Sequence, residues 1–252
     1  MNKQRFTTKL GTKELIIEVG EFAQSANAAV MVQMGETVVM ATACMSSYVR
    51  DGMNFFPLMV DYEEKLYAAG RIKGSRFIKR EGRPTDNAVL VARFIDRALR
   101  PLFDQSMRND IQVIVTALAF DEEHDPDILA LIAASCALHI SDIPWDGPIG
   151  ATRVSKVNDT WLTNPTYSER TKTDFDLDVA GTGEKVVMIE AEGDEAKEEH
   201  LLLLSWLVEF FRRDTHDLLL ELTGEQGSGI LTSMNRANCF VILPAESEGV
   251  NV

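Results

Sequence analysis

The chain has 252 residues, of which 45% are hydrophobic and 25% charged, and its formal net charge is −14. These proportions are ordinary for a folded globular protein, and the length allows one large core or one domain with a smaller appendage. The first residues lack the apolar run of a signal peptide, and the three cysteines form neither a metal-binding pattern nor a disulfide framework. We therefore expect a cytoplasmic protein.

The first quarter of the chain, residues 5–62, predicts β-strands. Apolar and polar residues partly alternate over 15–19, which is typical of a strand with one buried face. Residues 30–34 and 37–44 are apolar and rich in β-branched residues, and a short glycine-containing turn separates them. This pattern predicts a hairpin, and a further strand is expected over 55–62.

Residues 71–100 form a basic island in this acidic chain. They contain three acidic residues and nine basic ones, namely Arg71, Lys73, Arg76, Lys79, Arg80, Arg83, Arg93, Arg97 and Arg100. Nine minus three gives the island a net charge of +6, so the rest of the chain carries −20. A charge division of this size predicts a site for a polyanion.

The first part of the island, residues 70–82, is a loop that begins and ends with glycine. In single-stranded nucleic acid recognition, cations follow the phosphates and an aromatic ring stacks on a base. The loop offers both, which a merely solvated loop with two or three cations would not. The candidate RNA-binding residues here are Arg76, Phe77, Lys79, Arg80 and Arg83.

The second part of the island predicts a helix over residues 85–100, with an apolar face and a threonine cap. Arg93, Arg97 and Arg100 are spaced i, i+4 and i+7, so they share one stripe and join the candidate RNA-binding residues. The alternative is a solvated face with acidic neighbours, because Asp96 can pair with Arg93 or Arg100.

Strands and one further helix are expected after the basic island. Residues 111–120 predict a buried strand, and the apolar helix that follows has Asp125 as its cap and Pro126 in its first position. Turn residues within 151–163 and 175–190 favour two hairpins. The order of elements indicates an α+β fold.

A row of aspartates lies in the first strand of the second hairpin. Asp174, Asp176 and Asp178 alternate, so they share one strand face and could bind Mg²⁺ through oxygen ligands. A solvated acidic face is the favoured interpretation, and the three remain weak candidates for a metal site. The four histidines have no metal-binding spacing.

The last part of the chain, residues 193–252, differs from the rest in its pattern. Residues 200–211 are strongly apolar but number only about a dozen, whereas a bilayer span needs roughly 20, so we expect a buried helix and no membrane partner. The acidic end favours disorder. The expectation is a helical, partly disordered tail.

Several long stretches resemble the first core domain of bacterial polynucleotide phosphorylase. They are collinear over roughly residues 5–192 and include FFPLMVDYEEKLYAAGRIKGS (Phe55–Ser75), ARFIDRALRPLF (Ala92–Phe103), DPDILALIAASCAL (Asp125–Leu138) and IPWDGPIGATRV (Ile143–Val154). The resemblance implies a ribonuclease PH-like β-α-β-α core, of the ribosomal protein S5 domain 2-like type, over residues 1–192. The tail, residues 193–252, is not matched to the family.

The resemblance also implies a function. Members of this family degrade RNA from its 3′ end, with inorganic phosphate as co-substrate, nucleoside diphosphates as products and Mg²⁺ as cofactor. Single-stranded RNA and other copies of the chain, in a trimeric or hexameric ring, are the implied partners. The resemblance implies that the catalytic groups lie in a second core, which we expect this chain to lack, so no catalytic residue is assigned.

Departures from the family pattern support that assignment. A serine-rich turn holds phosphate in the active core, but this chain has His124-Asp125-Pro126-Asp127, whose carboxylates repel phosphate. Asp176 matches a family aspartate, whereas Asp178 stands where the active core has lysine.

The loop departs from the family as well, because Phe77-Ile78 and Lys79-Arg80 replace two phenylalanines and two arginines. We expect an RNA-binding, ring-forming first core that is inactive alone. The alternatives are an active single-core hexameric exonuclease, like ribonuclease PH or an archaeal exosome, and a non-enzymatic RNA-binding or interaction protein.

Overall fold

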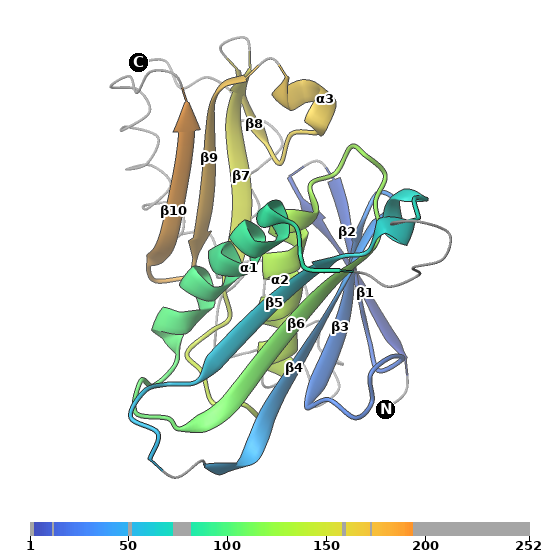
Figure 1. Ribbon diagram of the computed structural model, residues 1–252. Helices are drawn as coiled ribbons and strands as arrows, with labels where there is room; N and C mark the ends of the chain where they lie inside the picture. The colour runs from blue at the N-terminus through green and yellow to red at the C-terminus, as the bar shows by residue number, and fades with distance from the viewer. Residues whose placement is uncertain are drawn as a thin grey trace, which may run out of the picture.

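The structure, a computed structural model, describes residues 3–11, 13–49, 52–72, 82–157, 160–171 and 173–193, without the side chain of Asp174. In this part of the chain two β-sheets enclose two long helices (Figure 1). The α+β fold expected from the sequence is confirmed. Apart from Gly193, which ends a strand, the expected tail lies outside the described residues.

The first sheet has six strands in the order β1-β2-β3-β4-β6-β5. They are β1 (Gln4–Leu10), β2 (Lys13–Val19), β3 (Ala28–Met34), β4 (Thr37–Val49), β5 (Leu58–Glu64) and β6 (Asn109–Ala119). Neighbours are antiparallel except β5 and β6, which are parallel. The predicted hairpin is confirmed as β3 and β4, whose turn places Gly35 at φ +58°.

The strand patterns place the core on one face of this sheet. In β3, every second residue is buried, because successive side chains point to opposite faces of a sheet. β5 lies at the sheet edge and begins only after Pro57, as proline cannot donate a hydrogen bond to a ladder.

Helix α1 (Asp86–Leu99) follows the basic island's loop, as expected. Its cap is Thr85, whose Oγ1 accepts a hydrogen bond from the Ala88 backbone N–H at 3.0 Å. The helix gives way to a short 3-10 turn, η2 (Arg100–Leu102), at Pro101. Another such turn, η1 (Leu66–Ala69), follows β5.

Helix α2 (Pro126–Ile140) is buried almost all round, which explains why its sequence is apolar on every side. It packs on β3 and β4 of the first sheet and on β7 of the second. Its first turn lies where the two sheets approach each other, so side chains of both sheets can meet there (Figure 1).

The second sheet has the strand order β10-β9-β7-β8. Its strands are β7 (Gly150–Val157), β8 (Thr160–Thr163), β9 (Thr173–Gly181) and β10 (Val186–Gly193). The two predicted hairpins are present, and β7 also pairs with β9. The four-residue helix α3 (Tyr167–Arg170), between β8 and β9, was not predicted.

Candidate functional site

The first turn of α2 carries the residues that, by the resemblance, replace a phosphate-holding turn. Asp125 caps the helix, and its Oδ1 accepts a hydrogen bond from the Asp127 backbone N–H at 3.0 Å. The two carboxylates of this turn then diverge: Asp125 faces two arginines, and Asp127 faces a cavity.

The turn before α2 is held by Asp121. Its carboxylate accepts hydrogen bonds from the backbone N–H groups of Glu123 and His124 and contacts the His124 ring at 2.6 Å. Burial alone would raise the pKa of Asp121, but these hydrogen bonds hold it well below its usual range. The turn is thus fixed independently of the two carboxylates on α2.

Arg153 of β7 joins α2 to β9. Its Nε and Nη2 donate to the two carboxylate oxygens of Asp178 at 2.5 and 2.6 Å, and its Nη1 donates to Asp125 Oδ2. The side chain of Arg153 is 9% exposed. A two-pronged contact of this kind matches the planar guanidinium to a carboxylate and fixes both.

Arg170, at the end of α3, adds a second guanidinium. Its Nη1 donates to Asp125 Oδ2 at 2.8 Å, and its Nε donates to Asp176 Oδ2 at 3.2 Å. Ser155 donates from its hydroxyl to the other oxygen of Asp176. We call the set the carboxylate–guanidinium cluster: Asp125, Arg153, Arg170, Asp176 and Asp178.

The cluster includes two of the three aspartates that were candidates for a metal site, Asp176 and Asp178. Asp176 and Asp178 are neither solvated nor open, because guanidinium and hydroxyl donors engage their oxygens. Over the described ranges, no group of three or more His, Cys, Asp or Glu residues could hold a metal ion. This arrangement does not fit a Mg²⁺ site, and the side chain of Asp174 lies outside the description.

Sequence reasoning missed both arginines of the cluster. Arg153 lies in a predicted strand, and nothing local marks it as the partner of residues on β9. For Arg170 a signal existed: Thr166 and Glu169 form a capping box, with the Thr166 backbone N–H donating to Glu169 at 2.7 Å. That motif would have predicted α3.

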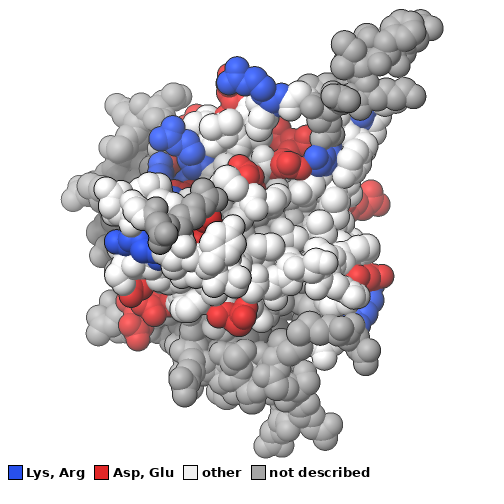
Figure 2. Space-filling model, turned by 60° about the horizontal axis from the view of Figure 1, so that its bottom comes forward, with Lys and Arg blue, Asp and Glu red and all other residues white. Residues whose placement is uncertain are grey.

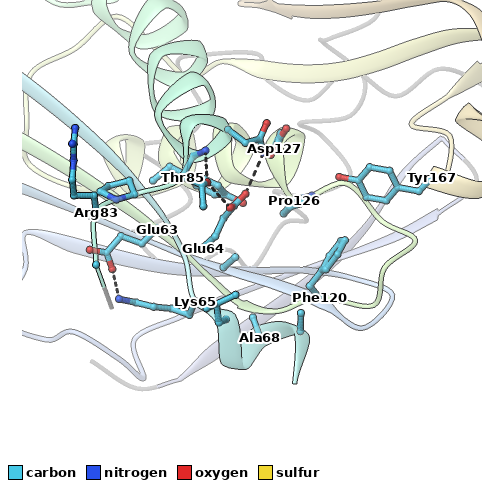
Figure 3. A pocket seen from close by; sticks show the side chains of 18 residues that line it. Glu63, Glu64, Lys65, Ala68, Arg83, Thr85, Phe120, Pro126, Asp127 and Tyr167 are labelled. Atoms are coloured by element: carbon cyan, nitrogen blue, oxygen red, sulfur yellow. Dashed lines mark hydrogen bonds and ion pairs between the residues drawn. The ribbon is translucent and has the colours of Figure 1, made fainter. Parts of the chain in front are cut away.

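A cavity of about 580 Å³ opens beside the cluster (Figure 3). The end of β5, turn η1, the N-terminal ends of α1 and α2, and Tyr167 of α3 surround it. Its polar and aromatic lining residues are Tyr62, Glu63, Glu64, Lys65, Arg83, Thr85, Asn87, Phe120, Asp127 and Tyr167. Its volume is within the usual range of small-molecule sites, about 300–1,000 Å³.

Three carboxylates line the cavity, and Glu63 is paired with Lys65 at 2.6 Å. Glu64 accepts hydrogen bonds from Thr85 Oγ1 at 3.0 Å and from Asn87 Nδ2 at 3.2 Å. The Asp127 carboxylate has no hydrogen-bond partner among the described residues. Burial, with the nearby carboxylates of Asp178 and Glu64, raises the pKa of Asp127 to about 7.

The cavity also holds a buried hydroxyl without a partner. Tyr62 is 2% exposed, and within the described ranges its hydroxyl makes no hydrogen bond. Burial raises the pKa of Tyr62, and that of Tyr167, because the phenolate form is poorly solvated there. A buried polar group without a partner is rare and calls for a physical explanation.

Most of the predicted RNA-binding loop lies outside the described residues, namely Arg76, Phe77, Lys79 and Arg80. Arg83 is described; it is exposed and lines the cavity. On the face in Figure 2, acidic and basic side chains are scattered around a largely uncharged area and form no single basic patch. The prediction of an RNA-binding loop therefore stays a prediction.

The arginine stripe on α1 has three different environments. Arg100 donates to both oxygens of Asp96, at 2.9 and 2.6 Å, and to the Leu58 carbonyl at 3.1 Å, so it is engaged in the structure of the domain. Arg97 contacts Glu190 of β10 at 2.6 Å, and both side chains are largely exposed. Arg93 is exposed, and no partner is found for it within the described residues.

Three family models match the chain. One described as the 3′ exoribonuclease family, domain 1, matches residues 11–144, and one described as domain 2 of that family matches residues 147–203. The third, described as the MoeA C-terminal region (domain IV), matches residues 207–252, which lie outside the described part. Of the helices described, none is long and apolar enough to cross a membrane.

Curated relatives carry the name polyribonucleotide nucleotidyltransferase. The one from Exiguobacterium sibiricum is 48% identical over 224 residues, which are 89% of this chain and 29% of that protein. The one from Bradyrhizobium sp. (strain ORS 278) is 53% identical over 192 residues, 76% of this chain and 27% of that protein. The chain thus spans less than a third of the length of these relatives.

Solved structures share the fold at low identity. The Archaeoglobus fulgidus exosome with RNA bound to the active site superposes with a TM-score of 0.59 at 19% identity, covering 77% of this chain and 83% of that chain. Rice (Oryza sativa) Rrp46 gives 0.58 at 14%, covering 84% and 93%. Because the domain 1 model alone matches more than half of the residues, the chain belongs to the 3′ exoribonuclease family.

Proposed function

We propose that this chain is the RNA-binding, ring-forming first core of a phosphorolytic 3′-to-5′ exoribonuclease. In the proposed reaction, inorganic phosphate attacks the 3′-terminal linkage of single-stranded RNA and releases a nucleoside diphosphate. The chain binds RNA and contacts its neighbours in a cytoplasmic ring, whereas catalysis and any Mg²⁺ site belong to a second core.

The observation that carries the proposal is the carboxylate–guanidinium cluster. The turn that would hold phosphate presents carboxylates, and both arginines near it are already paired with them. The cluster contains three carboxylates and two guanidiniums, so its formal charge is −1. A phosphate would meet net repulsion and no open cation there.

RNA binding is supported by the charge of residues 71–100 and by two exposed arginines in the described part. Arg83 lines the rim of the cavity, and Arg93 lies on α1 without a partner among the described residues. The loop residues Arg76, Phe77, Lys79 and Arg80 complete the proposed RNA-binding surface.

Ring formation is supported by exposed apolar side chains at one end of the first sheet. Tyr48 and Val49 at the end of β4 are 66% and 50% exposed, and Phe55 and Met59 near the start of β5 are 60% and 50% exposed. The strand register places both groups at the same end of the sheet. Exposed apolar surface of this kind marks interaction sites.

The test of catalysis uses the purified chain, a labelled oligoribonucleotide, phosphate and Mg²⁺. We expect no phosphate-dependent release of nucleoside diphosphates above background. Release of nucleoside diphosphates would establish the alternative, an active single-core exonuclease, and a hexamer on a sizing column would support it. A monomer that binds no RNA would favour the remaining alternative, a non-enzymatic interaction protein.

The test of RNA binding is a salt series. If the loop meets about 3–4 phosphates, log affinity should fall with log salt at a slope of roughly −2 to −3, since each phosphate on a single strand contributes about −0.7. The double change Lys79→Ala and Arg80→Ala should reduce that slope by about 1.4. An unchanged slope would place the RNA elsewhere.

A further inference from the structure

The cavity beside the cluster contains two polar groups that the fold leaves unused. They are the Tyr62 hydroxyl, which is buried without a hydrogen-bond partner, and the Asp127 carboxylate, which has none among the described residues. Both line the same 580 Å³ space. Because groups of this kind are normally satisfied, their joint presence in the wall of one cavity points to a ligand that supplies the missing partners.

The walls of the cavity restrict the class of ligand. In Figure 3, Phe120 and Tyr167 lie at one end, Glu63, Lys65 and Arg83 lie at the other, and Asp127 lies between them. The two rings meet edge to face, with their centroids 5.9 Å apart. Aromatic walls suit a flat ring system, and Arg83 at the opposite end suits a phosphate, whereas Lys65 beside it is paired with Glu63 at 2.6 Å.

Asp127 restricts the ligand further. An ionised carboxylate only accepts hydrogen bonds, through two neighbouring oxygens. Guanine offers two adjacent donors, N1–H and N2–H, whereas adenine and cytosine each place an acceptor beside their donor, and uracil has one N–H between two carbonyls. Glu64 is less suited to this role, because Thr85 and Asn87 already donate to its two oxygens.

We propose that the cavity is a guanine-binding site, in which Asp127 accepts the N1–H and N2–H groups and Tyr62 supplies a further hydrogen bond. Phe120 and Tyr167, which pack edge to face on each other, contact one side of the base, and Arg83 lies toward its phosphate. The base can come from an RNA strand or from a free nucleotide. With RNA as the source, the inference rests on the proposed RNA-binding function; with a nucleotide it does not.

The first experiment measures binding of guanosine 5′-monophosphate to the full chain by calorimetry at pH 8. The adenosine, cytidine and uridine monophosphates are titrated in parallel. Guanosine monophosphate should bind at least about tenfold more tightly than the others, since a two-pronged base contact discriminates by about 1–3 kcal/mol and each 1.4 kcal/mol is tenfold. Equal affinities for the four nucleotides, or no binding of any, would overturn the proposal.

Variants then assign the discrimination to residues. Asp127→Asn keeps the shape but offers one donor and one acceptor, so guanosine monophosphate should bind about tenfold or more weakly. Tyr62→Phe removes only the hydroxyl and should weaken binding about 3–10-fold, in line with one neutral hydrogen bond. Asp61→Asn, an exposed residue on the same strand as Tyr62, is the matched control and should change nothing.

Melting curves of each variant accompany these titrations. Unchanged guanosine monophosphate binding in a folded Asp127→Asn protein would overturn the proposal. If that variant does not fold, the comparison of the four nucleotides on the wild type and the Tyr62→Phe result still decide.

The second experiment separates the two sources of the base. Oligouridylate is compared with the same oligomer carrying one internal guanosine. A preference for the guanosine-containing oligomer that Asp127→Asn removes assigns the site to RNA, whereas binding of the mononucleotide without such a preference assigns it to free nucleotides. If guanosine monophosphate binds but no RNA does, the proposed function fails and the guanine site stands. If RNA binds and the four bases are not discriminated, the guanine site fails and the proposed function stands.

Discussion

Asp125 and Asp127 lie two residues apart on the first turn of α2, yet their carboxylates have opposite environments. Asp125 receives donors from Arg153 and Arg170, and Asp127 receives none from the described residues while facing the carboxylates of Glu64 and Asp178. Asp125 is therefore a structural contact bound by two arginines. Asp127, on the same helical turn, faces the cavity and is partly protonated near pH 7. The difference arises from the strands that approach each side, and the turn itself is common to both.

The largest loss of stability is expected from a substitution that breaks the ion pairs of Asp125 and Asp178. Arg153→Ala leaves the buried carboxylate of Asp178 without its two-pronged partner and removes one of the two guanidinium donors to Asp125. Removal of one member of a buried ion pair costs about 3–5 kcal/mol, so the free energy of unfolding should fall by that amount. Urea denaturation of the purified protein measures it.

Arg93→Ala is the matched control for this change, because Arg93 is exposed and has no partner among the described residues. Its free energy of unfolding should stay within about 0.5 kcal/mol of wild type. A loss below about 1 kcal/mol in Arg153→Ala would mean that the cluster does not close this side of α2.

A smaller, pH-dependent effect on stability is expected from Asp127. The pKa of Asp127 is about 7 in the folded protein and about 3.8 in an unfolded chain. Between these values the folded state holds a proton that the unfolded state has released, so this group makes stability fall as pH rises toward 7. Asp127→Asn cannot ionise and escapes the loss.

The variant should accordingly resemble wild type near pH 4 and be more stable by up to about 4 kcal/mol at pH 8, since the pKa rises from 3.8 to about 7 and each unit corresponds to about 1.4 kcal/mol. Melting temperatures of both proteins across this pH range test the difference. A difference in melting temperature that does not change with pH would contradict the raised pKa of Asp127 and the contrast between Asp127 and Asp125.

How much of this contrast the sequence could predict depends on the distance between partners along the chain. The caps Thr85 and Asp125 could be predicted, because a cap is a local feature of a few residues. The pairing of Arg153 with Asp178 could not, because it depends on β7 lying beside β9. The unpaired hydroxyl of Tyr62 is likewise a property of the folded cavity, which a strand pattern does not reveal.

The smallest effect is expected from the arginine stripe on α1. Like the two aspartates, its arginines differ in whether they have a partner. Arg100 is paired with Asp96, whereas Arg93 has no described partner. We expect Arg93→Ala to reduce the salt slope of RNA binding by about 0.7, the share of one phosphate, with no change in melting temperature. Arg100→Ala should do the reverse, with a loss of about 1–2 kcal/mol in unfolding free energy and an unchanged slope. Equal slopes for both variants would remove the stripe from the RNA-binding surface.

The hydrogen bonds at Glu64 have a consequence for how this family can evolve. They tie the end of β5 to the start of α1, and Phe120 holds turn η1 through its backbone N–H to the Ala68 carbonyl at 3.1 Å. The segment 71–84 thus leaves and rejoins the core at two anchored points. Doubling the length of such a segment costs only about 0.6 kcal/mol of closure entropy. Insertions and substitutions between these two anchored points should therefore leave the stability of the core nearly unchanged.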